Sequence, residues 1–292
     1  MTQRTRPRVA TSLAALALLA GPAAHADLVA RGDAAWARRA DGAQGGLART
    51  GPVLEAVRHY EDAVDARADD LEARWKLLRA LHFLGDFSQA DEALASRASE
   101  RARDVAEHGL DRLAQRAGAG ARLESFDPAS LPTRLNAAGV ARHDAARLYF
   151  WSAIGWGAWS QRVGLLSAVR QGVANRLHDY TRVTIALEPG YDDGGALRLL
   201  GRLHAELPRV PFVSGWVDRD RALPLVERAY GLAPEHPGNR LLLALTLLDL
   251  APDRRAEARE LLSGVGELEP RPDMRVEDLT LRRQARERLR DV

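Results

Sequence analysis

The sequence lacks several features that would point to particular classes of protein. None of its 292 residues is cysteine, which excludes disulfides, thiolate metal sites and the cysteine that a bacterial lipoprotein anchor requires. β-branched residues are sparse, which disfavours an extended β-sheet. After residue 26, no apolar run approaches the roughly 20 residues that a membrane-spanning helix needs. We therefore expect no transmembrane segment in the mature chain.

The one conspicuous apolar run lies near the start, where residues 1–26 have the pattern of a secretory signal peptide. Three arginines come first, an apolar segment follows over 9–20, and the stretch ends in Ala-His-Ala. This small-residue ending matches the motif that signal peptidases cleave. We expect cleavage after Ala26 and a periplasmic mature chain of residues 27–292.

A strong excess of either charge is also missing. The sequence has 42 Lys and Arg against 40 Asp and Glu, and removal of the three arginines in residues 1–26 would leave 39 basic side chains against 40 acidic ones. Nucleic-acid-binding proteins usually carry a clear basic excess. Neither the composition nor the predicted export indicates a nucleic-acid partner.

Recognisable catalytic and metal-binding motifs are absent as well. The eight histidines are scattered without the H-E-x-x-H spacing, and no G-x-S-x-G sequence occurs. The stretch 192–195, Asp-Asp-Gly-Gly, supplies too few spaced oxygens for a calcium loop and is more typical of a glycine turn. We expect no enzyme activity, no cofactor and no metal, and a hydrolase or lyase is the least favoured alternative.

Helical periodicity, by contrast, runs through almost the whole sequence. Small, large and small residues recur at offsets 0, 4 and 7, as in the second helix of a tetratricopeptide repeat, where small residues let helices approach. The matching residues are Ala56-Tyr60-Ala63, Ala90-Leu94, Ala222-Val226-Ala229 and Ala258-Leu262-Val265, the last two followed by Pro234 and Pro270. The pattern predicts an all-α fold of tetratricopeptide-like helical hairpins stacked as an α-solenoid.

The segments between the repeats are also expected to be helical. The expected helices cover 28–40, 52–68, 97–117, 144–161, 163–187, 196–207 and 274–292. Asp144 is expected to cap the fourth of these helices, and the last one is expected to cap the exposed end of the solenoid. Glycines and prolines make 118–135 a candidate internal break within a single domain of residues 27–292.

The most distinctive stretch is 149–161, which holds five of the sixteen aromatic residues of the chain. Three tryptophans on one helix carry more apolar surface than a monomer usually exposes, so the helix must be covered. Two hypotheses remain for what covers this helix: plain core packing, or a ligand-lined cavity or protein interface. Trp151 is the candidate core residue. On the cavity hypothesis the ligand-binding residues are Trp156, Trp159, Ser152 and Tyr149, with Arg198 facing a ligand carboxylate or bracing the preceding loop.

Two stretches resemble the T-component of tripartite ATP-independent periplasmic (TRAP) transporters. They are the aromatic helix 149–161 and the segment 189–208, which is followed by the repeat at 222–234. Together with the other repeats, the resemblance covers nearly all of the mature chain, although Ala196 stands where the family pattern leads us to expect proline.

The resemblance implies an all-helical periplasmic subunit that can assemble as a homotrimer around a central hydrophobic pore. Such a subunit would dock a periplasmic solute-binding protein in a solute uptake system and could also hold a hydrophobic or amphipathic small molecule. The alternative is a periplasmic tetratricopeptide adaptor or scaffold for envelope proteins that has no small-molecule ligand.

Overall fold

The computed structural model describes residues 22–118 and 120–292, and within them the chain forms thirteen α-helices and no strand. The helices are α1 (Pro22–Ala37), α2 (Thr50–Ala66), α3 (Leu71–Asp86), α4 (Glu92–Arg116), α5 (Leu131–Ala137), α6 (Arg142–Val163), α7 (Leu165–Arg170), α8 (Val173–Leu187), α9 (Gly195–Glu206), α10 (Ala222–Leu232), α11 (Pro237–Leu250), α12 (Arg255–Glu267) and α13 (Arg275–Arg290). Short 3₁₀ turns and loops connect them. The predicted all-α class is confirmed.

Several helix starts follow directly from the local sequence. Asp70 accepts a hydrogen bond from the backbone N–H of Ala73 at 3.0 Å and begins α3. Asp91 does the same for Leu94 at 2.7 Å and begins α4. Carboxylates at these positions satisfy backbone N–H groups that the first turn leaves without a helical partner.

The centre of the chain differs from the sequence-based expectation. The helix expected over 163–187 is divided into α7 and α8, because Gly164 and Gly172 adopt φ values of +81° and +65° that end a right-handed helix. Asp144 does not cap α6, which begins two residues earlier at Arg142. The Asp144 carboxylate instead accepts a hydrogen bond from Trp75 Nε1 at 3.2 Å.

The repeat register is confirmed in three of the four segments. The nine residues at offsets 0, 4 and 7 in these segments are buried: Ala56, Tyr60, Ala63, Ala222, Val226, Ala229, Ala258, Leu262 and Val265. In the remaining segment the register is wrong, because Ala90 precedes the Asp91 cap and lies outside α4. Ala95, Ser99 and Ala102 occupy the equivalent buried positions instead.

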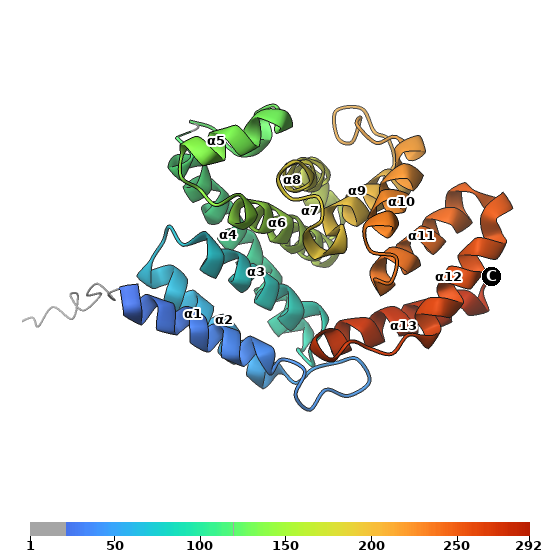
Figure 1. Cartoon of the computed structure of the whole chain (residues 1–292), viewed down its shortest axis with the longest axis horizontal. Helices are drawn as coiled ribbons and strands as arrows, with labels where there is room; N and C mark the ends of the chain where they lie inside the picture. Colours follow the sequence, from blue (N-terminus) through green and yellow to red (C-terminus); the bar gives the residue numbers. More distant parts are fainter. Residues whose placement is uncertain (1–21, 119) are drawn as a thin grey trace, which may run out of the picture.

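Successive helices pack side by side and form a curved stack (Figure 1). The helix α6 lies in the middle and contacts α3, α4 and α8. We call the helices α1 to α4 the N-terminal arm and the helices α9 to α13 the C-terminal arm. The helix α8 packs against both α6 and α9 and so connects α6 to the C-terminal arm. The chain is a tetratricopeptide-like α-solenoid, as the repeat pattern predicted.

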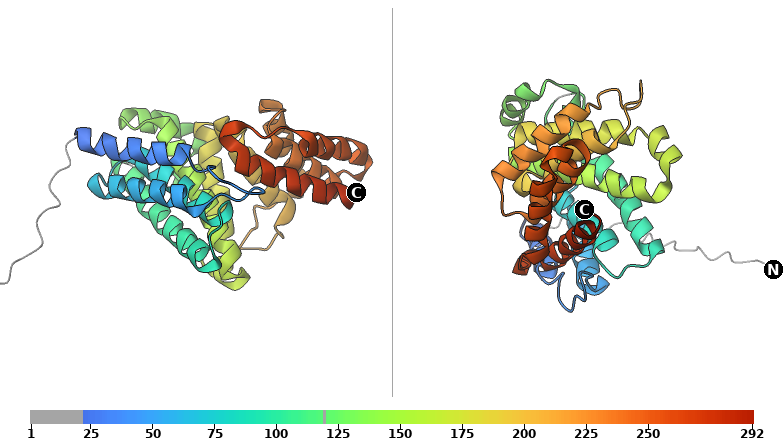
Figure 2. Two further views of the ribbon diagram at one scale, coloured as in Figure 1. Left: turned by 90° about the horizontal axis from the view of Figure 1, so that it is seen from below. Right: turned by 90° about the vertical axis from the view of Figure 1, so that its right-hand side faces the viewer.

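The curvature brings the last helix back to the first hairpin (Figures 1 and 2). Arg39, just after α1, donates to the Glu277 carboxylate of α13 at 3.1 Å, and the Thr280 hydroxyl donates to the Gly46 carbonyl at 3.4 Å. The expectation that α13 covers an otherwise exposed end is therefore incomplete, because α13 also joins the two arms of the stack.

The apolar core consists of two clusters. The larger one includes residues of α1 to α9 and Val276, and the smaller one joins α10 to α13. Leu123, Leu131 and Leu135, from the region 118–135, are fully buried within the larger cluster. The internal break proposed there stays a prediction.

Most of the predicted signal peptide, residues 1–21, lies outside the described residues. Residues 22–26 belong to α1, where the buried His25 ring contacts the Asp70 carboxylate that caps α3. Cleavage after Ala26 and export stay predictions. Within the described part of the chain, no helix is both long enough and apolar enough to cross a membrane.

Candidate functional site

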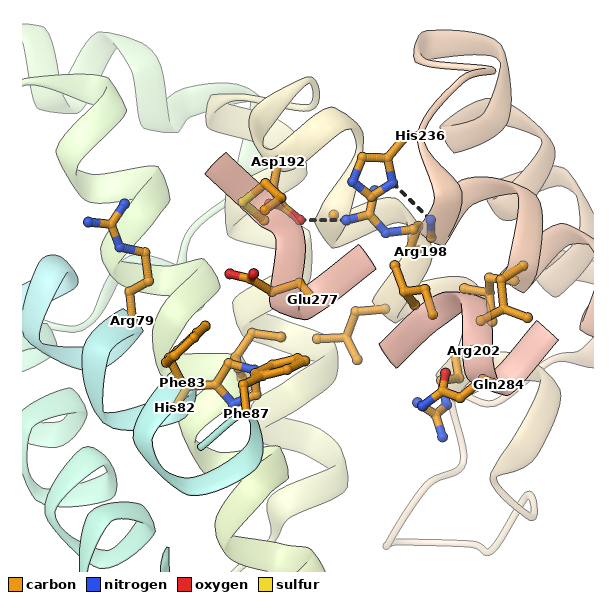
Figure 3. Close-up of a pocket in the computed structure, with 18 of the residues that line it drawn as sticks. Arg79, His82, Phe83, Phe87, Asp192, Arg198, Arg202, His236, Glu277 and Gln284 are labelled. Atoms are coloured by element: carbon orange, nitrogen blue, oxygen red, sulfur yellow. Dashed lines mark hydrogen bonds and ion pairs between the residues drawn. The ribbon is translucent and has the colours of Figure 1, made fainter. Parts of the chain in front are cut away.

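A cavity of about 1060 Å³ lies between the two arms of the curved stack. Its walls come from α1, α3 and α6 on one side and from α9, α11 and α13 on the other. Figure 3 labels lining residues of α3, α9 and α13. Pockets that hold small ligands in proteins typically have volumes of about 300–1,000 Å³. This cavity is therefore large enough for a small molecule with an extended apolar part.

The side chains of α3 and of Phe87, the residue that follows it, form an aromatic wall with one arginine. Arg79, His82, Phe83 and Phe87 follow the i, i+3, i+4, i+8 spacing of one helix face and line the cavity (Figure 3). The Phe83 and Phe87 rings stack with centroids 5.6 Å apart, and Trp36 of α1 meets Phe83 edge-on at 5.4 Å. Edge-on and offset aromatic contacts hold such rings in fixed orientations.

The helix α6 extends this wall with Phe150 and Trp151. Trp151 Nε1 donates to the hydroxyl of Tyr191 at 2.8 Å, and the Phe150 ring meets both Trp151 and Tyr191 edge-on. A Cβ added at Gly195 would lie 2.8 Å from the Phe150 ring. Glycine at the start of α9 is therefore what lets the Asp-Asp-Gly-Gly turn approach α6 and close this end of the cavity.

The opposite wall is aliphatic. Five leucines from α9, α11 and α13 line it: Leu199, Leu241, Leu242, Leu245 and Leu281. All but Leu241 are only partly buried by the surrounding protein. An apolar part of a ligand that packed against these leucines would bury more of their surface. Burial of apolar surface stabilises a complex by about 25 cal/mol per Å².

Arg198 of α9 holds the turn that precedes its helix. Its guanidinium pairs with the Asp192 carboxylate and donates to the Asp193 carbonyl at 3.0 Å and to Asn239 Oδ1 at 2.8 Å. Burial raises the pKa of the Asp192 carboxyl above its usual range, and the positive charge of Arg198 opposes that shift. Arg198 thus braces the loop, one of the two roles expected for it, and it also lines the cavity (Figure 3).

His236 lies beside this ion pair and is held neutral. Its Nδ1 accepts a hydrogen bond from the Gly238 N–H at 3.2 Å and thereby caps α11. Burial, followed by the positive charges of Arg198 and Arg271, lowers the pKa of His236 to about 3. Arg271 is itself neutralised by Asp278, which accepts two hydrogen bonds of 2.8 and 2.9 Å from its guanidinium.

The entrance to the cavity is formed by exposed polar side chains of α9 and the end of α13. They are Arg202, Glu206, Gln284, Glu287, Arg288 and Asp291. In Figure 3, Arg202 and Gln284 lie at the side of the pocket opposite Arg79. The cavity therefore has a polar entrance, an aliphatic wall and an aromatic end that contains an arginine.

Four of the five residues predicted to bind a ligand lie on the other side of α6. Trp156 and Trp159 pack edge-on with centroids 5.5 Å apart, which confirms the face predicted for them. Trp156 contacts α4 and the Arg176 guanidinium of α8, and Trp159 lies under the Arg103 guanidinium of α4. Trp156 Nε1 donates to Glu107 of α4 at 3.0 Å. The Tyr149 hydroxyl contacts Glu124, and the buried Ser152 hydroxyl has no hydrogen-bond partner among the described residues.

Trp156, Trp159, Ser152 and Tyr149 thus lie in the protein core, and of the predicted set only Arg198 lines the cavity. Ligand contact by these residues stays a prediction. Trp151, which was expected to be a core residue, is half-buried and lines the cavity. The aromatic helix is covered by protein on one face and borders the cavity with the other.

The sequence contains one signal for this site that matches no known motif. Arg79, His82 and Phe83 of α3 and the following Phe87 make a polar and aromatic stripe, but in sequence this stripe resembles an ordinary buried helix face. Within residues 22–118 and 120–292, no group of three or more His, Cys, Asp or Glu side chains is placed to hold a metal ion.

Fold and cavity together define an all-α helical-repeat protein with an internal amphipathic cavity. No protein-family model and no curated protein matches the sequence. Among solved structures, the crystal structure of yeast Tom70 is similar at 15% sequence identity and a TM-score of 0.19, over 93% of this chain and 65% of the Tom70 chain.

Proposed function

We propose that the protein is a periplasmic helical-repeat subunit that holds a small amphipathic molecule in its central cavity. It would act as an accessory subunit of a TRAP-type uptake system and dock a periplasmic solute-binding protein. The observation that carries the binding role is the cavity of about 1060 Å³, with an aliphatic wall, an aromatic end and a polar entrance. The transporter role rests on the resemblance of 149–161 and 189–208 to the T-component family.

The binding role is tested by native mass spectrometry of the full chain purified from its own periplasm without detergent. We expect a mass above that of the bare chain by one small molecule. Leu199→Trp, which fills the aliphatic side of the cavity, should lose the additional mass, whereas Leu165→Trp on the outer surface should retain it. A bare mass for the wild type, combined with no binding of any added amphiphile, would contradict the proposal.

A second feature supports the docking role. The short helix α7 carries Leu165, Leu166 and Val169 with exposed fractions of 82%, 72% and 43%. Large apolar side chains that cluster on a surface often mark a protein contact. We propose that α7 contributes to the contact with the solute-binding protein or with further copies in a homotrimer.

The docking role is tested by chemical cross-linking in periplasmic extract, followed by identification of the linked protein. We expect a solute-binding protein as the partner of the wild type, and its loss when Leu165 and Leu166 are both replaced by Glu. Leu54→Glu, at a 38% exposed position of α2, serves as the matched control and should keep the cross-link. If envelope proteins of other kinds are linked and no ligand is found in the cavity, the adaptor hypothesis is favoured instead.

A further inference from the structure

We propose that the ligand of the central cavity carries an anionic head group, a carboxylate, that binds Arg79 at the aromatic end. Its apolar tail would lie along the leucines of α9, α11 and α13. This inference rests on the proposed binding function and adds the chemical class of the ligand and the residue that recognises its charge.

The first observation is that Arg79 is the one half-buried arginine of the cavity wall without a carboxylate partner among the described residues. The other buried or half-buried arginines of the wall are paired: Arg39 with Glu277, Arg198 with Asp192 and Arg271 with Asp278. Burial lowers the pKa of Arg79, which shows that its charge lies in a poorly solvated place. A buried charge without a partner destabilises the fold, and an anion bound there would remove that cost.

The hydrogen bonds that Arg79 lacks also favour an anionic ligand. Its Nε is buried and has no hydrogen-bond partner among the described residues. Guanidinium groups bind carboxylates through two parallel N–H donors, which gives strong and oriented hydrogen bonds. The Arg79 Nε–H thus has no hydrogen-bond partner among the described residues, and because this atom is buried, an anion in the cavity would bind the terminal N–H groups of the guanidinium.

The second observation is a series of arginines stacked on aromatic rings. Arg39 and Arg79 lie over the Trp36 ring at 4.4 and 4.1 Å from its centroid, and Arg79 also lies 5.2 Å from the Trp75 centroid. Stacking on aromatic rings fixes the position of a guanidinium group without neutralising its charge. Arg79 is thus held in place, so an anion would meet an ordered donor.

The series continues to Arg147 of α6, which lies over Trp75 at 5.2 Å and over Tyr191 at 5.3 Å. Arg147 also lacks a carboxylate partner among the described residues, and its Nε is buried without a hydrogen bond. It does not line the cavity, but it adds a second uncompensated positive charge behind Tyr191, which does. Arg79 and Arg147 are thus two neighbouring arginines at the aromatic end that form no ion pair with a described carboxylate.

The same geometry argues against a cationic ligand. Aromatic rings can form a cage around a quaternary ammonium group, but here guanidinium groups already lie over the rings of Trp36 and Tyr191. At these two rings a ligand cation would meet three arginines, Arg39, Arg79 and Arg147, instead of free ring faces. The acidic side chains Glu287 and Asp291 lie at the entrance, so a carboxylate would be favoured at the inner end and disfavoured outside it.

The test is isothermal titration calorimetry of the full chain with three twelve-carbon amphiphiles below their micelle concentrations. They are dodecanoate, dodecanol and dodecyltrimethylammonium. We expect dodecanoate to bind about tenfold or more tightly than dodecanol, as one charge-assisted hydrogen-bonded contact would give. The ammonium compound should bind least tightly.

Arg79→Gln should bring the affinity for dodecanoate down to that for dodecanol and leave the affinity for dodecanol unchanged. Arg202→Gln, which removes an exposed arginine of the entrance paired with Glu206, is the matched control and should retain the preference. Arg79→Lys keeps the charge and should keep a reduced preference. If Arg79→Gln fails to fold by circular dichroism, Arg147→Gln should reduce the preference about threefold through the loss of a nearby charge.

The outcomes separate this inference from the proposed function. If wild-type protein binds none of the three compounds, the binding function itself is wrong. If dodecanol binds as tightly as dodecanoate, or if Arg79→Gln retains the full preference, the cavity binds amphiphiles but the anionic head group and the role of Arg79 are wrong.

Discussion

The two faces of α6 carry similar residues and have different environments. Trp156 is 2% exposed, donates a hydrogen bond to Glu107 and lies under the Arg176 guanidinium, whose Cζ is 4.5 Å from its ring centroid. Trp151, five residues earlier, is half-buried, donates to Tyr191 and borders the cavity. One aromatic helix therefore serves both as core and as the wall of a cavity.

The two faces differ because neighbouring helices pack closely against one of them and leave a cavity beside the other. On the side of Trp156, α4 approaches so closely that a Cβ added to Gly155 would lie 3.3 Å from the Ala102 Cβ. On the side of Trp151, the curvature of the stack leaves space that α9 and α13 border without filling. Residue type decides that a helix must be covered, and the curvature of the stack decides which face borders open space.

The largest difference in stability between the two faces of α6 is expected when their tryptophans are replaced. Trp156→Ala should lower the free energy of unfolding by about 3–5 kcal/mol, because a fully packed ring and a buried hydrogen bond to Glu107 are lost. Trp151→Ala should cost roughly half as much, because part of its surface faces the cavity. Urea denaturation of both variants checks this, and equal losses would mean that the two faces are packed alike.

A smaller effect on stability is expected where α9 packs against α10. A Cβ added at Gly201 of α9 would lie 2.6 Å from Val226 Cγ1 and 3.2 Å from the Ala222 carbonyl oxygen. Gly201→Ala should therefore cost about 1–3 kcal/mol through overpacking of α9 on α10. Gly231→Ala in α10 is the control, since its added Cβ meets no atom within 4 Å. A neutral Gly201→Ala, measured by the same denaturation, would show that the repeat contact is looser than described.

His236, which lines the cavity, is expected to make the free energy of unfolding depend on pH. The pKa of His236 is about 3 in the folded protein and about 6.5 in an unfolded chain. Below pH 6.5 the unfolded state binds a proton that the folded state does not, so stability falls as the pH decreases toward 3. The slope from this one group is up to about 1.4 kcal/mol per pH unit.

His236→Asn keeps a side chain that can cap α11 but removes the titrating group. Its unfolding free energy should therefore fall less steeply than that of the wild type between pH 6 and 4, as measured by urea denaturation at several pH values. His143→Asn, at an exposed position, should keep the wild-type slope. If His236→Asn also keeps the full slope, His236 is not the group responsible.

The smallest expected effect again compares two sides of α6. Gly157→Ala should raise the free energy of unfolding by about 0.5–1 kcal/mol, since alanine favours the helix and its Cβ would meet Leu177 at an ordinary 3.9 Å. Gly155→Ala should gain less, because its Cβ would crowd Ala102. Thermal unfolding of the pair checks the difference. A larger gain for Gly155→Ala would contradict the close contact between α6 and α4.

Local periodicity was sufficient to predict the helical fold and most of the repeat register. Ala222, Val226 and Ala229 are buried as their spacing predicts, because an amphipathic helix buries the same stripe whatever its partner. The break of the helix expected over 163–187 was missed, because isolated glycines are tolerated inside helices and only the surrounding fold determines their φ values.

The cavity could not be predicted from local sequence. Its walls combine residues from Trp36 to Asp291, and they meet only because the solenoid curves until α13 reaches the first hairpin. The cluster of tryptophans led to the prediction that Trp156 and Trp159 bind a ligand, whereas Arg79 and Trp151 line the cavity. Which face of α6 borders the cavity depends on packing between residues far apart in the sequence. Helical periodicity carries no information about that packing.

The most direct test is a fluorescence titration that compares Trp151→Phe with Trp156→Phe. With dodecanoate added below its micelle concentration, we expect the wild-type tryptophan emission to change and Trp156→Phe to retain that change. Trp151→Phe should lose a large part of it, because the ring that borders the cavity is gone. If Trp156→Phe loses the response and Trp151→Phe retains it, the ligand binds at the opposite face of α6 and the cavity described here is not the binding site.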